Sequence, residues 1–389
     1  MSDTADVIVI GAGVQGASLA FHLASRGASV VVLERSTIAA GATGRSSGLV
    51  RMHYDLLAET RLAWASYPWF RDWAERVGGD CGFTRTGFLW IEPADGAARL
   101  RANVAAHRAL GIDASVVDAA EIRRLAPGLA VDDDEVAASE PGSGYADPSG
   151  TATGFLRAAR DLGARLVQGA EVTGIPVAGG RVAGAETSRG SFAAPVVVNA
   201  AGAWAGRVAA LAGLDIPVTV WRHDTGYLGV PASVPRPIPV VIDNGHGMYF
   251  RPEGAELVLV GLEDNSEMGG SPDRDTSEAE ADFRDRATER IIRRVPGLID
   301  GTFRTSHSGQ DGLTPDQRPI LGQAGPDGFY LDCGHSGTGF KTAPGVGLGM
   351  SELILDGAAT SVDIAPFAFG RFAEGRHLAG EHGGSLIWR

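Results

Sequence analysis

Four residues near the start of the chain have the types and spacing of a dinucleotide-binding site: Gly11, Gly13, Gly16 and Glu34. Such glycines form a tight turn, let the backbone approach a pyrophosphate and let a helix pack closely on a strand. The start of that helix attracts phosphate oxygens, and an acid about twenty residues further on can accept a hydrogen bond from a ribose hydroxyl. We therefore expect a bound dinucleotide here; a glycine-rich turn without a ligand is the alternative.

The elements that must position these residues follow from the hydrophobic pattern. Residues 6–10 form a short β-branched run, typical of a buried parallel strand, and residues 29–33 form a second one. The residues between them have helical periodicity, and Gly27 can end the helix. This order of strand, glycine turn, helix, strand and acid gives the glycine pattern its specificity.

Three further segments combine small residues with strand or helix boundaries. Residues 41–48 are too polar for a strand and poor in helix formers, so they form either a loop crowded against an extended cofactor or a flexible surface loop. Residues 196–198 read as a strand that runs into small residues at its carboxyl end, where open α/β sheets bind ligands. Residues 329–349 repeat the order of strand, glycine loop and helix.

The composition limits the classes of function. The chain has 389 residues, 44% of them hydrophobic and 21% charged, which predicts a globular protein of two to three domain units. Glycine makes up about 14% of it, roughly twice the average, but glycine and proline together stay below the range of disordered chains. The net charge of −13 and the lack of a lysine or arginine cluster argue against a nucleic-acid partner.

Cysteine usage and the N-terminal segment bear on the compartment. Cys81 and Cys333 cannot form a disulfide framework, and no cysteine or histidine pair has zinc-site spacing, so we expect no metal. Residues 7–24 are apolar, but no basic segment precedes them, so we expect neither a signal peptide nor a membrane span. These features favour a cytoplasmic protein.

The four segments together resemble the FAD-dependent amine and amino-acid oxidoreductase family, which includes D-amino-acid oxidase, glycine oxidase and sarcosine oxidase. The matching blocks are residues 7–35, 41–54, 196–204 and 313–349, and the sarcosine oxidase-like branch is nearest. The resemblance implies an α/β (α+β) fold, with a Rossmann-like FAD-binding domain and a second, mostly antiparallel-sheet substrate domain. We assign the FAD-binding domain to residues 1–80, 145–215 and 305–389, and the substrate domain to residues 81–144 and 216–304.

The resemblance also implies which residues hold FAD, which we expect to be bound without a covalent link. They are Gly11, Gly13, Val14, Gln15, Gly16, Glu34, Arg35, Thr43, Gly44, Arg45, Ser46, Ser47, Val172, Ala201, Gly202, Trp204, Gly337, Thr338, Gly339, Phe340 and Lys341. Val172 matches the residue whose backbone meets adenine. Trp204 can equally be a core aromatic.

The implied reaction moves hydride from the carbon that bears the amine to flavin N5 and leaves an imine, which water hydrolyses. Candidate catalytic residues are Arg51, His53, Tyr249, Arg251 and Lys341. The cations would bind a substrate carboxylate. Tyr249 and Arg251 fall on one face of a predicted hairpin strand, which we expect to face the substrate. A histidyl link to the flavin would need a residue such as His53, and we do not expect one.

Departures from the family pattern narrow the substrate. Gly309 replaces the cysteine to which single-chain sarcosine oxidases attach flavin. Leu259 and Glu263 occupy the strand in which those relatives carry an oxygen-activating lysine and an active-site histidine, which puts fast oxygen use in doubt. Thr314 lies near the position of the carboxylate-binding arginine of glycine and D-amino-acid oxidases.

We therefore expect a small amine substrate with a carboxylate, a secondary amino acid that is N-methylated or cyclic, with O2 or another electron acceptor. A primary amino-acid oxidase of the D-amino-acid or glycine type and a noncatalytic FAD-binding assembly subunit are the alternatives. Elsewhere, the charged residues 273–294 predict a solvated helix, and the acidic residues 132–135 predict a surface turn rather than a metal site.

Overall fold

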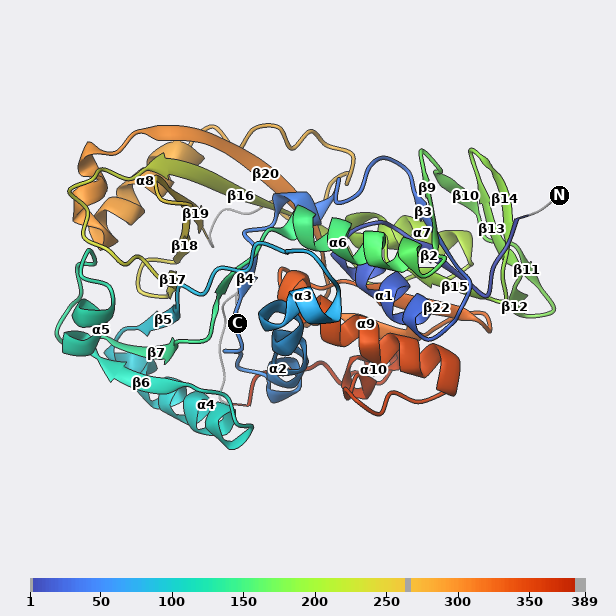
Figure 1. Cartoon of the computed structure of the whole chain (residues 1–389), viewed down its shortest axis with the longest axis horizontal. Coiled ribbons are helices and arrows are strands. Elements are labelled where there is room, and N and C mark those ends of the chain that lie inside the picture. Colours follow the sequence, from blue (N-terminus) through green and yellow to red (C-terminus); the bar gives the residue numbers. More distant parts are fainter. Residues whose placement is uncertain (1–2, 263–266, 382–389) are drawn as a thin grey trace.

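The computed structural model describes residues 3–262 and 267–381. Its two large sheets lie toward opposite ends of an elongated molecule (Figure 1). The first has six strands in the order β21 (Ile320–Gln323), β22 (Phe329–Cys333), β15 (Val196–Asn199), β2 (Val7–Ile10), β3 (Val30–Glu34) and β9 (Arg165–Gln168). Neighbouring strands are parallel except β21, which runs antiparallel to β22.

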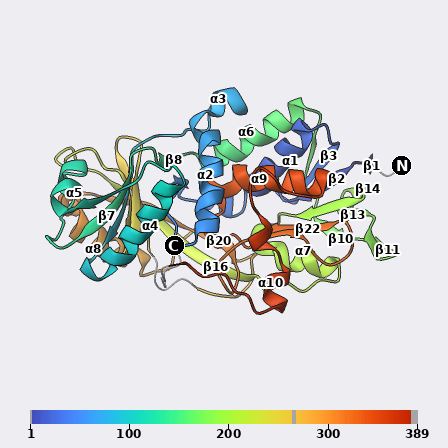
Figure 2. The ribbon, with the colours of Figure 1, turned by 90° about the horizontal axis from the view of Figure 1, so that it is seen from below.

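Alternate residues of β2 enter two different cores, which explains why the whole strand is apolar. Val7 and Val9 join the cluster that contains the helices, whereas Ile8 and Ile10 join the cluster on the other face. The helical face carries α1 (Val14–Ser25), α6 (Pro148–Asp161) and α9 (Gly339–Asp356), which Figure 2 shows side by side, and α2 (Leu57–Arg71) packs on α9. The opposite face carries α7 (Ala205–Leu211) and a small sheet of β1 (Asp3–Thr4), β14 (Gly190–Ala193), β13 (Gly184–Thr187) and β10 (Val172–Gly174).

The second large sheet has eight strands. Their order is β20 (Phe303–Leu313), β16 (Thr219–Gly229), β19 (Leu257–Leu262), β18 (Met248–Glu253), β17 (Val240–Asp243), β5 (Phe88–Glu92), β7 (Val136–Glu140) and β6 (Ser115–Asp118). All neighbours are antiparallel except β17 and β5. One face packs against α8 (Phe283–Arg294) and α5 (Ala119–Leu125), and the other contributes to the core that contains α4 (Ala97–Ala109).

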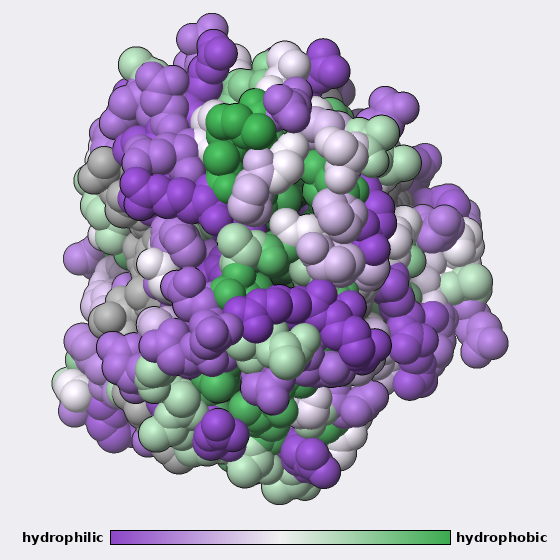
Figure 3. Space-filling view, turned by 90° about the vertical axis from the view of Figure 1, so that its left-hand side faces the viewer, coloured by the Kyte–Doolittle hydropathy of each residue, from purple (hydrophilic) through white to green (hydrophobic). Residues whose placement is uncertain are grey.

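Short elements complete the described chain. They are β4 (Leu49–Val50) with β8 (Gly144–Tyr145), β11 (Val177–Ala178) with β12 (Arg181–Val182), α3 (Trp73–Arg76), α10 (Gly370–Ala373), η1 (Ala42–Arg45), η2 (Ala94–Gly96), η3 (Gly202–Trp204), η4 (Pro296–Asp300) and η5 (Ala365–Phe367). None of the helices in the described ranges is long and apolar enough to cross a membrane. The end of the molecule that carries the eight-stranded sheet has a mostly hydrophilic surface with small hydrophobic patches (Figure 3).

The structure confirms the predicted α/β fold class and corrects two local predictions. The helix predicted for residues 273–294 begins only at Phe283, because only its later part has apolar residues that pack on the sheet. Its last residue, Arg294, is buried and forms ion pairs with Glu135 and Asp243, whereas Arg293 is exposed, so the helix is solvated on one face only. The acidic run therefore ends in a buried side chain rather than lying wholly in a surface turn.

Candidate active site

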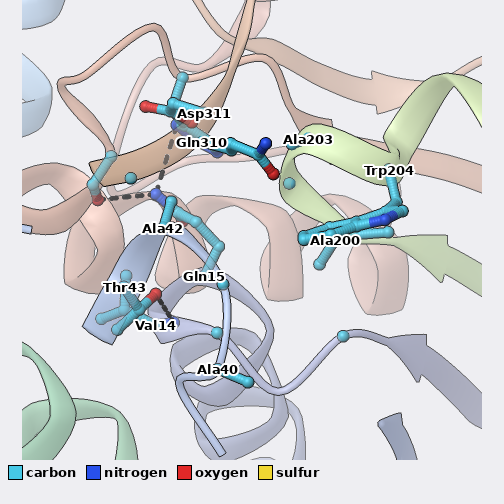
Figure 4. Close-up of a pocket in the computed structure, with 18 of the residues that line it drawn as sticks. Val14, Gln15, Ala40, Ala42, Thr43, Ala200, Ala203, Trp204, Gln310 and Asp311 are labelled. Atoms are coloured by element: carbon cyan, nitrogen blue, oxygen red, sulfur yellow. Dashed lines mark hydrogen bonds between the residues drawn. The ribbon is translucent and has the colours of Figure 1, made fainter. Parts of the chain in front are cut away.

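A cavity of about 500 Å³ lies where the four glycine-rich segments meet (Figure 4). Its lining combines the turn after β2, the end of β3, the loop around η1, the segment around η3, part of β20 and the loop before α9. Segments that are far apart in the sequence therefore enclose one elongated space, and its size is that of a small-molecule or cofactor site.

The turn after β2 has the close backbone packing that its glycines predict. Gly11 has a φ of +111°, and a Cβ there would lie 2.5 Å from the carbonyl oxygen of Ala200. A Cβ at Gly16 would lie 2.1 Å from the carbonyl oxygen of Gly11, so only glycine lets α1 pack this closely on the turn. Both positions need glycine because neighbouring backbone lies too close for a Cβ, and Gly11 and Gly13 leave a cradle of bare backbone in the cavity wall, which fits a bound pyrophosphate.

Glu34 lies in the cavity wall at the end of β3. Its carboxylate accepts hydrogen bonds from the backbone N–H groups of Ala12 at 2.9 Å and Ser36 at 2.7 Å. These bonds hold the carboxylate beside the glycine turn, where its remaining lone pairs can accept from a ribose hydroxyl.

Two hydrogen bonds connect the segments around this turn (Figure 4). The Val14 N–H donates to the Thr43 hydroxyl at 3.0 Å, and the Gln15 side-chain amide donates to the Gly339 carbonyl at 2.8 Å. The second bond joins α1 to the first residue of α9. The start of α1 is thus fixed relative to η1 and to the start of α9.

Three aromatic side chains form a wall on the side of the eight-stranded sheet: Trp221, His223 and Tyr249. The ring centroids of Trp221 and His223 are 5.0 Å apart, and those of His223 and Tyr249 are 5.7 Å apart. The Tyr249 hydroxyl and His223 Nε2 are 3.0 Å apart. A Cβ at Gly261 would lie 2.4 Å from the Tyr249 ring, so this glycine allows the ring to lie flat across β19.

Burial sets the protonation of this wall. It lowers the pKa of His223 to about 3, with a smaller contribution from His307, so His223 is neutral near pH 7. It also raises the pKa of Tyr249, which keeps the phenol protonated. The sequence pattern predicts Tyr249 but neither Trp221 nor His223. Their signal in the sequence is a period of two along β16, in which Trp221, His223, Thr225 and Tyr227 share a face.

Arg51 and Lys341 lie near the same tyrosine. The Arg51 guanidinium lies 4.2 Å and the Lys341 ammonium 5.9 Å from the ring centroid of Tyr54, and all three residues are buried. Burial, and next the charge of Arg51, lowers the pKa of Lys341 to about 7. The Lys341 ammonium also donates to the carbonyl oxygen of Gly337 at 3.3 Å, and Gly337 lines the cavity.

Arg251 and His53 lie in other surroundings. Arg251 donates to the Ser47 carbonyl at 2.5 Å, forms an ion pair with Glu253 at 2.6 Å and stacks on Tyr145. Its charge is therefore paired. His53 is buried against Trp90, and desolvation holds its pKa well below the ordinary value.

His53 also belongs to the one group of possible metal ligands found among the described residues. It comprises His53, His107 and Glu140, whose ligand atoms lie within 4.8 Å of one another. The Arg51 guanidinium acts electrostatically on all three of these side chains, and its positive charge opposes a cation there.

Most of the predicted cofactor residues border the cavity. Those that do are Gly11, Gly13, Val14, Gln15, Glu34, Arg35, Thr43, Arg45, Ser46, Ser47, Val172, Ala201, Gly202, Trp204, Gly337, Gly339 and Phe340. Gly16, Gly44, Thr338 and Lys341 lie outside its lining, as do the candidate substrate residues Arg51, His53 and Arg251. The lining also includes residues that we did not predict, among them Ser36, Arg207, Gln310, Asp311, Asp332 and His335.

The positions that depart from the family pattern differ in exposure to the cavity. Gly309 lines it, and a Cβ there would lie 3.0 Å from the Cβ of Arg45. Leu259 is buried in β19 and pairs with Arg251 across the sheet. Glu263 lies outside the described residues.

Comparison with known proteins gives consistent matches over nearly the whole chain. The family described as FAD dependent oxidoreductase matches residues 6–353. Mitochondrial sarcosine dehydrogenase of Mus musculus is 32% identical over 378 residues, covering 92% of this chain and 40% of that protein. Sarcosine oxidase subunit beta of Rhodobacter capsulatus is 26% identical, covering 96% of this chain and 90% of that subunit. The chain thus spans 40% of the length of the sarcosine dehydrogenases.

Solved structures match equally broadly. L-proline dehydrogenase from P. horikoshii superposes with a TM-score of 0.90 and 26% identity, covering 97% of this chain and 100% of that one. Glycine oxidase from Geobacillus kaustophilus has a TM-score of 0.83 and 26% identity, covering 95% and 99%.

Proposed function

Because this chain belongs to the FAD-dependent oxidoreductase family, we propose that it oxidises the carbon–nitrogen bond of a secondary amino acid, either N-methylated or cyclic. The names of two relatives, sarcosine dehydrogenase and L-proline dehydrogenase, refer to amino acids of these two kinds. The structural observation that supports the proposal is a single cavity with a dinucleotide cradle at one end and the wall of Trp221, His223 and Tyr249 at the other.

We assign separate roles to the two parts of the chain that the sequence distinguishes. Residues 1–80, 145–215 and 305–389 would hold FAD without a covalent bond, and residues 81–144 and 216–304 would cover the substrate. When bound, FAD supplies a two-electron acceptor that takes hydride from the carbon next to the amine. The substrate then carries an imine, which water hydrolyses. The chain's own residues bind the carboxylate, orient the carbon and control the charge of the amine.

Lys341 and Arg51 are the proposed carboxylate-binding pair. Both are buried beside Tyr54, and Lys341 donates to the carbonyl of Gly337, which lines the cavity. A charge-assisted hydrogen bond to such a cation contributes about 1.5–3 kcal/mol, enough for one or two contacts to select carboxylated amines.

The aromatic wall would favour the uncharged amine, whose lone pair drives hydride loss. His223 is neutral, Tyr249 is a protonated phenol and Lys341 is already difficult to charge. A second ammonium group in this desolvated space would be costly, whereas the His223 and Tyr249 pair can accept or donate a hydrogen bond to the neutral amine.

The proposal is tested by mixing the FAD-loaded protein with amines in the absence of air and following flavin bleaching. We expect sarcosine, proline and pipecolate to reduce the flavin at least tenfold faster than glycine and D-alanine. Pyrrolidine is the matched control for proline, because it lacks only the carboxylate. Reduction that is slow with proline and equally slow with pyrrolidine would contradict the proposal that the protein binds the substrate carboxylate.

The similarity to glycine oxidase favours a second candidate, oxidation of a primary amino acid. Faster bleaching by glycine or D-alanine would select it. If no amine bleaches the flavin, the noncatalytic assembly subunit becomes the better reading. Admitting air after bleaching then separates O2 from another electron acceptor, since only a chain that uses O2 regains its colour quickly.

A further inference from the structure

The segment between β19 and α8 contacts the cavity wall through its described residues. Its described part, residues 267–282, contains neither a helix nor a named strand. Gln310, which lines the cavity from β20, donates to the backbone carbonyls of Ser271 and Arg274 at 3.3 Å each. We call residues 271–275 of this segment the strap.

One carboxylate of the strap, that of Asp273, accepts hydrogen bonds from three side chains of the cavity wall. Asp273 accepts from Arg35 at 3.0 Å, from the indole N–H of Trp204 at 2.7 Å and from Arg207 at 2.5 Å. The Arg35 guanidinium also stacks 4.1 Å from the centroid of a Trp204 ring. The donors come from the end of β3, from η3 and from α7, so a single side chain joins three elements of the six-stranded region.

The charge of Asp273 is retained across the ordinary pH range. Hydrogen bonds from Arg207 and Trp204, followed by Arg35, hold the pKa of this carboxyl well below its usual value. The exposed fractions of the side chains are 46% for Asp273, 40% for Arg35 and 54% for Arg207. These contacts therefore add little to folding stability. Their effect is instead to fix the directions of the three donor side chains.

All three donors line the cavity at its nucleotide end. Arg35 follows Glu34, and Arg207 is one turn of α7 away from Leu211, which borders the same space. We propose that Asp273 is a positioning residue for the cofactor: it holds Arg35, Trp204 and Arg207 in the cavity wall and ties the strap across the nucleotide end, so that FAD leaves slowly. This inference concerns FAD retention and does not depend on the amine substrate proposed above.

The test compares Asp273→Asn with Asp275→Asn. Asp275 lies two residues further along the same segment and is exposed, and its carboxylate accepts from the backbone N–H and the hydroxyl of Ser277, at 2.9 Å and 2.6 Å. Both variants remove one negative charge. FAD release is measured as the recovery of free-flavin fluorescence after dilution, and thermal unfolding checks that both variants are folded.

We expect FAD release from Asp273→Asn to be at least tenfold faster than from the wild type, with Asp275→Asn within twofold of it. Added salt should speed release from the wild type more than from Asp273→Asn, because salt screens the same exposed ion pairs. If Asp273→Asn purifies without FAD, titration of the apoprotein replaces dilution, and a tenfold weaker Kd is expected. Equal release or equal Kd for the two variants would overturn the proposal, whatever amine the protein oxidises.

Discussion

At the scale of single residues, Lys341 links the chemistry of the site to pH. Its ammonium donates to the carbonyl of Gly337 in the cavity wall, and burial lowers its pKa from 10.5 to about 7. The side chain is therefore a cation that can hold a carboxylate in acid solution and a neutral amine in alkaline solution. The same shift makes folding more favourable as the pH rises from about 7 towards 10.5, because over that range only the unfolded lysine stays protonated.

The binding of a carboxylated amine should follow this titration. We expect kcat/KM for proline, relative to that for pyrrolidine, to fall as the pH rises through about 7, since Lys341 loses its charge. The ratio removes most of the effect of deprotonating the substrate amine. Lys341→Arg should give a flat ratio, as should Lys341→Met at a value roughly tenfold or more below that of the wild type at pH 6.

Steady-state kinetics across pH 6 to 9 measure this ratio for the three proteins. A wild-type ratio that does not change with pH, or a Lys341→Met profile that retains the slope, would assign the carboxylate to another group.

Some site residues were readable from the sequence because their function depends on backbone. Gly11, Gly16 and Glu34 stand in a local pattern of strand, turn and helix, and the structure brings all three beside one cradle. His223 was missed, because the strand that carries it acquires its role only when the distant Tyr249 is placed beside it. Arg251 shows a different limit of sequence patterns. The alternation of side chains along the strand predicts that Arg251 and Tyr249 share a face, but it cannot predict the ion pair between Arg251 and Glu253.

At the scale of elements, close helix packing determines where the nucleotide turn lies. α1 carries the turn and packs on α9, where Gly347 faces Ser18. A Cβ at Gly347 would lie 2.9 Å from the backbone carbon of Ser18 and 2.4 Å from its hydroxyl. The rigid part of this contact is backbone, so a side chain here must push the two helices apart.

We therefore expect Gly347→Ala to destabilise the protein. Overpacking costs about 1–3 kcal/mol, which outweighs the roughly 1 kcal/mol that alanine gains over glycine in a helix. Gly206→Ala in α7 is the control, because the nearest atom to its Cβ would be 3.9 Å away. It should keep or raise stability. Denaturant unfolding measures both, and a Gly347→Ala variant as stable as the wild type would show that α1 and α9 can separate freely.

The elements also show why part of the fold escaped prediction. Strands β2 and β3 were predictable because both of their faces are buried, which makes them apolar throughout. Residues 273–282 have the charge content of a solvated helix but are ordered by side-chain bonds, such as those from Arg207 to Asp273. Such bonds depend on the position of α7, which no local pattern along the strap reveals.

At the scale of the whole molecule, one ligand would contact most of the structural parts. The cavity is bordered by both large sheets, by α7 and by the loop before α9. A ligand that binds only the folded chain stabilises it by an amount that grows with the logarithm of its concentration relative to Kd, about 2.7 kcal/mol at a hundred times Kd. Removal of FAD should therefore lower the free energy of unfolding of the whole protein rather than loosen one region.

We expect added FAD at a hundred times its Kd to raise the Tm of the apoprotein by several degrees. FMN, which lacks the AMP half, should raise it less at the same concentration, because it offers Glu34 no ribose hydroxyl and the turn at Gly11 only one phosphate. Differential scanning fluorimetry at equal concentrations of the two flavins measures both shifts. Acid precipitation should leave the flavin in the supernatant, and flavin that stays with the precipitate would contradict non-covalent binding.

The long strands β16 and β20 have a mechanical consequence. They pair over most of their length, and β20 ends in the cavity wall, where a Cβ at Gly312 would lie 3.1 Å from the carbonyl oxygen of Gly202. This two-stranded ribbon is thus anchored in the eight-stranded sheet at one end and pressed against η3 at the other. If the two large sheets moved apart as rigid bodies, Gly309, Gln310 and Asp311 would have to leave the cavity wall. Entry and release of small molecules must therefore rely on the movement of loops, while β16 and β20 keep the two large sheets at a constant separation.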